Sequence, residues 1–156
     1  MTDKPAHSAT EVLAPNECWG LLREVSVGRL AVWLKDHPEI FPVNYTVDHG
    51  SVVFRTGPGR KLDGAKGDIP VAFEADGVNA DTGVTWSVVV KGSATVLEST
   101  GDVLDSFSLS LFPWQPGRKD TFVRIVPTEI SGRRFKVAQP ADWWTSQSDA
   151  TQTSQE

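Results

Sequence analysis

Apolar and polar residues alternate along much of the chain, which is the pattern of β-strands that bury one face. The clearest case is residues 40–48, where every second residue from Phe41 to Val47 is apolar or aromatic and the residues between are polar or proline. We expect this strand to be half-buried. The same alternation, or a short apolar run, predicts further strands over residues 27–34, 51–56, 69–76, 84–97, 121–126 and 128–137.

Helical patterns occupy three shorter stretches. Pro15 is a start signal, and the apolar residues that follow at spacings of three and four predict an amphipathic helix that ends near Glu24. We expect a second helix over residues 102–111 and a short one that opens at Arg60. Cys18 lies on the apolar stripe of the first helix, so an inert core thiol is expected rather than a nucleophile.

Many strands, few helices and turn signals between the strands are typical of an antiparallel barrel rather than a parallel sheet. Turns are expected at His37–Pro38 and His49–Gly50, because proline and glycine favour them. The chain has no GxGxxG or Walker pattern, which argues against a Rossmann or P-loop protein. The expected fold class is therefore mainly β, with a six- to seven-stranded antiparallel barrel and a few short helices.

Three cations surround a glycine-rich turn at residues 57–59. Arg55 precedes the turn, and Arg60 and Lys61 follow it at the start of the expected short helix. Arginine can hold phosphate oxygens with a planar fork, lysine supplies a point charge, and free N–H groups at a helix start add positive potential. These residues would suit a phosphate monoester. The alternative is a solvated basic surface.

Pro42 interrupts the alternating strand over residues 40–48. A proline cannot donate to a strand ladder, so it marks an edge or a bulge, where neighbouring backbone groups are left available to a ligand. Protection of an edge against pairing with another strand is the simpler explanation.

Length and charge limit the function classes. A chain of 156 residues fits one domain, and a net charge of −5 argues against a nucleic-acid groove. One cysteine excludes an intramolecular disulfide, and the three histidines lack metal-ligand spacing, so no metal site is expected. No apolar run approaches the roughly 20 residues of a membrane span, and the first residues contain no signal-peptide core. We therefore expect a cytoplasmic protein with no nucleic-acid or membrane partner.

No catalytic residue stands out. The chain has no GxSxG elbow or Cys–His arrangement, and a strand end and a polar loop explain the carboxylates Glu74, Asp76 and Asp81 better than paired acid–base catalysis does. Residues 1–11 and 145–156 are polar, and we expect both to be disordered tails around a single domain at residues 12–144.

Six segments stand in a characteristic order: VGRLAV (27–32), FPVNYTVDHGSVVFRT (41–56), KL (61–62), VAFEAD (71–76), WSVVVKGSA (86–94) and PW (113–114). Together they resemble the flavin-binding split β-barrel proteins related to pyridoxamine 5′-phosphate oxidase, in particular actinobacterial members of that flavin and deazaflavin oxidoreductase superfamily. The resemblance implies an FMN-binding split barrel and a homodimer with two FMN sites at the subunit interface. It also implies that Arg55 and Lys61 hold the flavin phosphate and that the backbone from Val43 to Tyr45 faces the flavin ring.

On this resemblance, a set of residues from four parts of the chain is expected to bind the cofactor. Trp114 would form a wall of the pocket, or it packs in the barrel or the interface, and the same question stays open for Trp143 and Trp144. The full set is Pro42, Val43, Asn44, Tyr45, Phe54, Arg55, Thr56, Arg60, Lys61, Leu62, Trp86, Ser87 and Trp114.

The leading functional hypothesis is an FMN-dependent oxidoreductase that acts on a small organic substrate. Oxidation of pyridoxamine phosphate itself is not expected, because the arginine and histidine cluster near the C-terminus of the true oxidases has no counterpart around residues 132–137. One alternative is a flavin or haem binding or storage module without turnover. Another is an F420-dependent reductase, whose longer phosphate-bearing cofactor would need further cations such as Arg60, Arg118, Lys119 and Arg133.

Overall fold

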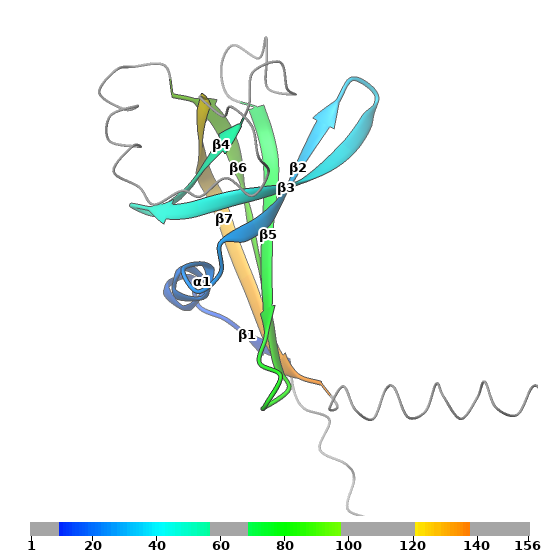
Figure 1. Ribbon diagram of the computed structural model, residues 1–156, viewed down its shortest axis with the longest axis vertical. Coiled ribbons are helices and arrows are strands. Elements are labelled where there is room, and N and C mark those ends of the chain that lie inside the picture. Colours follow the sequence, from blue (N-terminus) through cyan, green and yellow to red (C-terminus); the bar gives the residue numbers. More distant parts are fainter. Residues whose placement is uncertain (1–9, 57–68, 98–120, 138–156) are drawn as a thin grey trace, which may run out of the picture.

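The computed structural model describes residues 10–56, 69–97 and 121–137. Within these residues the chain forms seven strands and one short helix (Figure 1). The helices predicted at Arg60 and over residues 102–111 lie outside them. The elements are β1 (Glu11–Val12), α1 (Pro15–Leu22), β2 (Val27–Leu34), β3 (His37–Asp48), β4 (Ser51–Thr56), β5 (Ile69–Val78), β6 (Val84–Val96) and β7 (Thr121–Lys136).

All pairings between the described strands are antiparallel, in the order β1-β7-β4-β3-β2-β5-β6. A further pairing of β6 with β7 closes six of the strands into a barrel, while β1 is added near the end of β7 (Figure 1). The prediction of a mainly β, six- to seven-stranded antiparallel barrel is confirmed.

The hydrophobic core fills the barrel, and α1 covers it near β6 and β7. Phe54 and Phe73 are almost fully buried there, and the ring of Tyr45 meets Phe73 edge to face, with centroids 4.7 Å apart. The hydroxyl of Tyr45 donates a hydrogen bond of 2.5 Å to the carbonyl of Leu22. This bond connects the last residue of α1 to the barrel.

Helix α1 starts at Pro15, as predicted, and ends at Leu22, two residues before the predicted end. Cys18 is fully buried, and its Sγ lies so close to Gly132 of β7 that a Cβ there would collide with it. Burial raises the pKa of the Cys18 thiol, which disfavours the reactive thiolate. The expected core position of Cys18 is confirmed. No described helix has the length and hydropathy needed to cross a membrane.

The β3–β4 hairpin turns at His49 and Gly50, as predicted, and both residues have positive φ angles, 47° and 68°. The turn expected at His37–Pro38 is wrong. Leu34 pairs with His37, so the chain turns two residues earlier, at Lys35 and Asp36, and Lys35 has a φ of 55°. Proline is tolerated in β3 because this part of the strand has β2 as its only described neighbour.

Strand β7 is continuous, which corrects the prediction of two strands separated near Pro127. The pairing with β6 shifts between Lys91 and Gly92, and Gly92 lies opposite Pro127. A Cβ at Gly92 would collide with the carbonyl of Val126. The proline is therefore accommodated at a β-bulge, where glycine permits close approach of the two backbones.

The first described strand begins inside the predicted N-terminal tail. Glu11 of β1 pairs with Arg134 of β7, and its carboxylate accepts hydrogen bonds of 3.2 Å from both Nε and Nη2 of that arginine. Residues 1–9 and 145–156 lie outside the described residues. Strand β5 runs two residues beyond its prediction, to Val78, and β6 ends one residue earlier, at Val96.

Candidate functional site

The outer face of β4 and β7 carries the first group of candidate residues. Side chains alternate along β4, so that Phe54 points into the core while Val53 and Arg55 point to the other face. In the antiparallel register, Val53 is opposite Arg124 and Arg55 is opposite Phe122 of β7. Two arginines therefore lie on one face, with the fully buried Val53 between them.

Arg55 lies over an aromatic ring. The guanidinium carbon of Arg55 is 5.3 Å from the ring centroid of Phe122, within the range of a cation–π contact. The Arg55 side chain is half-buried, and Phe122 is 2% exposed. This contact places a cation near the end of β4.

Arg124, in contrast, is held by the β3–β4 hairpin. Its Nη2 donates to a carboxylate oxygen of Asp48 at 3.0 Å, and its Nη1 donates to Oγ of Ser51 at 2.5 Å. Nδ1 of His49 lies 2.7 Å from the other oxygen of the Asp48 carboxylate. Although desolvation opposes it, hydrogen bonding from Arg124 and His49 lowers the pKa of Asp48. This cluster ties the hairpin turn to β7.

Strand β3 changes neighbours at Asn44. Residues 37–44 pair with β2, while Tyr45 to Asp48 pair with β4, and Tyr45 is opposite Phe54. Beyond the Tyr45–Phe54 pair, the two strands no longer pair with each other. Asn44 of β3 pairs with β2, and Arg55 of β4 pairs with β7. The sheet therefore splits between β3 and β4 beside Arg55.

The edge of β3 beyond this split is shaped by two prolines. The N–H of Tyr45 donates to the carbonyl of Ser26, so the backbone of Tyr45 points toward β2. Because this direction alternates along a strand, every second residue from Pro38 to Asn44 points its N–H and C=O groups away from β2. Pro38 and Pro42 stand at such positions and have no N–H to offer. Both are exposed, and no described strand pairs with this edge. Pro42 thus marks an edge, one of the two settings its sequence position predicted.

The predicted cofactor-binding residues fall into separate regions. Pro42, Val43, Asn44 and Arg55 lie around the split between β3 and β4. The side chains of Tyr45, Phe54 and Trp86 belong to the buried core. Of Thr56 the structure describes the backbone, which pairs with Thr121. Arg60, Lys61, Leu62 and Trp114 lie outside the described residues.

Trp86 and Ser87 are remote from Arg55 within one chain. Ser87 is opposite Arg133 of β7, whereas Arg55 is opposite Phe122. The eleven residue-to-residue steps from Phe122 to Arg133 span up to about 36 Å of extended strand. The structure therefore does not bring Trp86 and Ser87 to Arg55 within a single chain.

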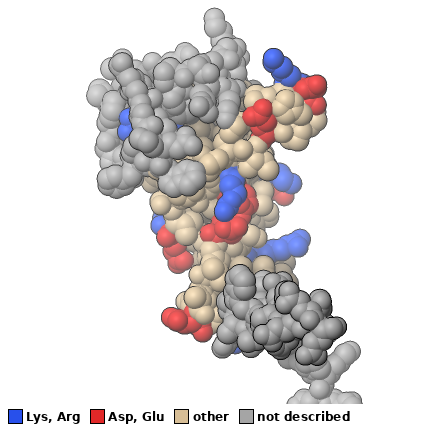
Figure 2. Space-filling model, turned by 45° about the vertical axis from the view of Figure 1, so that its right-hand side comes forward, with Lys and Arg blue, Asp and Glu red and all other residues tan. Residues whose placement is uncertain are grey.

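The sequence interpretation missed a cation that joins the carboxylates of β5. Nη1 of Arg29, on β2, is 3.1 Å from Glu74 and 3.3 Å from Asp76. Burial and a hydrogen bond with Asp76 raise the pKa of Glu74. No local pattern predicts this group, because the pairing of β2 with β5 decides which residues meet. The face in Figure 2 likewise shows basic and acidic side chains next to one another in small groups.

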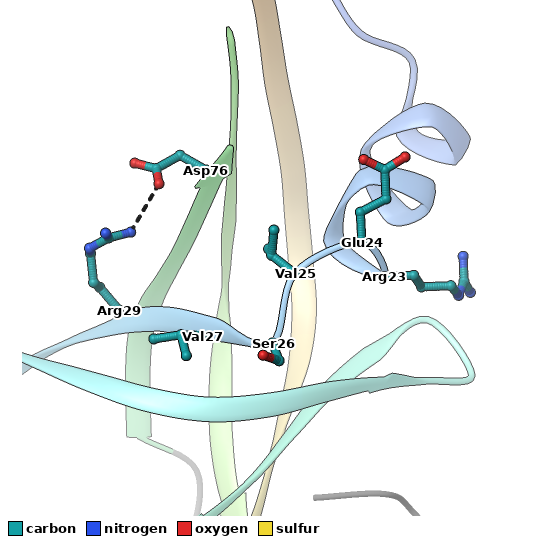
Figure 3. A pocket seen from close by; sticks show the side chains of 7 residues that line it. All are labelled: Arg23, Glu24, Val25, Ser26, Val27, Arg29 and Asp76. Carbon is teal, nitrogen blue, oxygen red and sulfur yellow. Dashed lines mark hydrogen bonds and ion pairs between the residues drawn. The ribbon is translucent and has the colours of Figure 1, made fainter. Parts of the chain in front are cut away.

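An open cavity of 470 Å³ adjoins this group. Figure 3 shows Arg29 turned toward Asp76, with Arg23 and Glu24 on the opposite side, where the chain leaves α1. Both signs of charge line the cavity, and Arg29 is already compensated by two carboxylates. Among the described residues, no group of three or more His, Cys, Asp or Glu side chains could hold a metal ion.

Comparison with known proteins reveals relatives along most of the chain. An uncharacterized protein of Mycobacterium tuberculosis is 35% identical over 135 residues, which cover 82% of this chain and 88% of that protein. The solved structure of the FAD binding protein from Mycobacterium smegmatis is 36% identical, with a TM-score of 0.70, over 81% of this chain and 98% of that one. The solved structure of a pyridoxamine 5′-phosphate oxidase candidate from Corynebacterium glutamicum is 40% identical, with a TM-score of 0.75. The match covers 83% of this chain and 100% of that one.

The family model described as pyridoxamine 5′-phosphate oxidase matches residues 14–134. The match begins just before α1 and ends within β7, so it includes nearly all of the closed barrel and the split beside Arg55. By sequence and by fold, the chain belongs to the pyridoxamine 5′-phosphate oxidase family.

Proposed function

We propose that the protein is a flavoprotein that holds the phosphate of a flavin nucleotide with Arg55 and uses the flavin to oxidise or reduce a small organic molecule. FMN is the cofactor that the sequence resemblance implies, and FAD is the one named for the Mycobacterium smegmatis relative. Both carry a phosphate on the ribityl chain, so one cation can serve either. The flavin supplies the electron transfer, and the protein supplies binding and orientation.

The observation that carries this proposal is the position of Arg55 at the split between β3 and β4. The guanidinium lies on the outer face of β4. It is next to the point where the pairing of β3 changes from β4, at Tyr45, to β2, at Asn44. A planar fork for phosphate oxygens and a strand edge for a flat ring therefore meet at one place. Lys61, which follows Arg55 by six residues, is the expected second phosphate ligand.

The residues of this region fit a flavin in their chemistry. Arg55 is half-buried, and partial burial strengthens the attraction of a guanidinium for a phosphate anion. The edge of β3 offers carbonyl groups and the N–H of Ile40, since Pro38 and Pro42 lack theirs. A ring with both donors and acceptors on its rim, such as a flavin, can use such a mixed edge.

We further propose that the complete site forms between two copies of the chain. Trp86 and Ser87 of β6 pair with β7 at Arg134 and Arg133, too far from Phe122, the partner of Arg55, to share one ligand with Arg55 within a chain. A homodimer in which β6 of one copy approaches the split of the other would unite them. Sedimentation or light scattering of the purified protein tests this arrangement, since a monomer that binds flavin at full affinity contradicts it.

The cofactor is tested by the absorbance spectrum of freshly purified protein and by the mass of the chromophore released on heating. Released FMN or FAD at near one per chain supports the proposal. A haem Soret band, the mass of F420, or a protein that takes up none of these when soaked contradicts it.

The oxidoreductase activity needs a separate test. A bound flavin that is reduced by a nicotinamide nucleotide, and then reoxidised by a small organic acceptor, supports an enzyme. A flavin that remains oxidised with every donor, but is reduced by dithionite, indicates a binding or storage protein.

A further inference from the structure

We propose that Phe122 is a positioning residue for the flavin phosphate, because its ring holds the guanidinium of Arg55 in place. The inference rests on the proposed function, and it adds a residue that was not among those predicted from the sequence. Phe122 itself touches no ligand in this proposal. It acts through Arg55.

The geometry of the pair is set by two neighbouring strands. Arg55 and Phe122 are direct partners in the antiparallel register of β4 and β7, so their side chains leave the sheet on the same face. The guanidinium carbon lies over the ring, 5.3 Å from its centroid. The carbonyl of Phe122 accepts a hydrogen bond of 2.9 Å from the N–H of Leu97, which fixes the backbone beneath the ring.

Phe122 is buried without being part of the barrel core. It is 2% exposed, yet the core cluster contains its strand neighbours Val123 and Ile125 rather than Phe122. Alternation along β7 directs Phe122 to the opposite face, beside Val53, which is also buried outside that cluster. A large aromatic residue is thus fixed on the face that carries Arg55.

An aromatic platform suits an arginine that must bind an anion. A carboxylate partner fixes a guanidinium by using its N–H donors and by compensating its charge, as Asp48 does for Arg124. A ring attracts the cation through its π-face and does not itself occupy the in-plane donors of the fork. Arginine also loses much rotamer freedom when it binds a ligand, so a residue that restricts Arg55 beforehand lowers the cost of binding.

The test is the flavin affinity of Phe122→Leu, which keeps an apolar side chain and removes the ring. Titration of flavin-free protein with FMN and with FAD, followed by quenching of flavin fluorescence, should show about three- to tenfold weaker binding. Phe122→Tyr keeps the ring and should retain affinity within about twofold of wild type. The matched structural control is Val53→Ala, which loosens the same buried face and leaves the ring in place.

A double-mutant cycle separates positioning from folding. In an Arg55→Ala background, Phe122→Leu should weaken binding no further, because the group that it positions is absent. Without flavin, the NMR signals of the Arg55 side chain should be shifted by the ring current of Phe122 and should lose that shift in Phe122→Leu. A purely structural effect of Phe122→Leu would instead weaken binding in the Arg55→Ala background as well.

The outcomes also distinguish this inference from the proposed function. If Arg55→Ala binds flavin as tightly as wild type, or wild type binds none, both are overturned. If Arg55→Ala weakens binding while Phe122→Leu does not, the positioning role alone fails. It also fails if Val53→Ala weakens binding as much as Phe122→Leu, or if Phe122→Leu has the same effect in the Arg55→Ala background.

Discussion

Arg55 and Arg124 lie on one face of the β4–β7 sheet, on either side of Val53, yet their surroundings differ. Arg124 is bound to the carboxylate of Asp48 at 3.0 Å, and both side chains of this ion pair are at most 25% exposed. Arg55 lies over the ring of Phe122. The comparison shows that residue type alone does not assign a role to a cation. Arg124 connects two segments of the chain through its carboxylate partner, whereas Arg55 contacts an aromatic ring.

The largest expected difference between the two arginines is in flavin affinity. Arg55→Ala should weaken FMN or FAD binding about 30- to 100-fold, because it removes charge-assisted hydrogen bonds worth about 2–3 kcal/mol. Arg124→Ala should change the dissociation constant by less than about threefold. Fluorescence titration at a temperature where both variants are folded measures this. Equal losses in the two variants would mean that the phosphate site has been wrongly assigned.

The second difference is in stability, with the order reversed. Arg124→Ala leaves the partly buried Asp48 without its arginine and Ser51 without a donor, so the free energy of unfolding should fall by about 2 kcal/mol. For Arg55→Ala of the flavin-free protein we expect a loss below about 1 kcal/mol. Urea unfolding at one fixed protein concentration measures both. A larger loss for Arg55→Ala would indicate that this cation is mainly structural.

The smallest effect should come from Asp48→Asn, which keeps the shape of the Arg124 clamp and removes its negative charge. At pH 7 we expect a loss of about 1 kcal/mol in the free energy of unfolding. The folded protein lowers the pKa of Asp48 below its ordinary value of 3.8, so the ionised carboxylate stabilises the folded state above that pH. This contribution is lost as the pH falls through the lowered pKa.

The difference in unfolding free energy between wild type and Asp48→Asn should therefore shrink below about pH 4. Urea unfolding at a series of pH values from 7 to 3 checks the sign of this dependence. A difference that stays constant down to pH 3 would mean that the charge of Asp48 contributes nothing to the clamp.

The two errors in the predicted strands have one physical cause. Both came from treating proline as a residue that ends a strand. Pro38 lies in β3, where its missing N–H would have pointed to an edge without a described partner strand, and Pro127 lies in β7 at the bulge opposite Gly92. In both places the ladder loses no hydrogen bond that the strand needs. Whether a proline breaks a strand depends on the neighbouring strand, which a local pattern does not contain.

Part of the candidate site was accessible from the sequence and part was not. Arg55 beside a glycine-rich turn and Pro42 inside an alternating strand are local signals, and the structure places both residues near the split between β3 and β4. Phe122 has no such signal, because it is 67 positions from Arg55 and meets that residue through strand register. The same holds for Arg29 with Glu74 and for Arg124 with Asp48.

The sequence by itself determined most of the strands, the His49–Gly50 turn, the edge marked by Pro42 and the buried position of Cys18. These follow from the period of the apolar residues and from the backbone limits of glycine and proline, which act over a few positions. The family came from the resemblance of six sequence segments to known proteins. The tertiary structure decided the continuity of β7, the split beside Arg55, the partner of each arginine and the distance between Arg55 and Ser87. Those features depend on which strands pair and in which register, and closing the barrel fixes both at once.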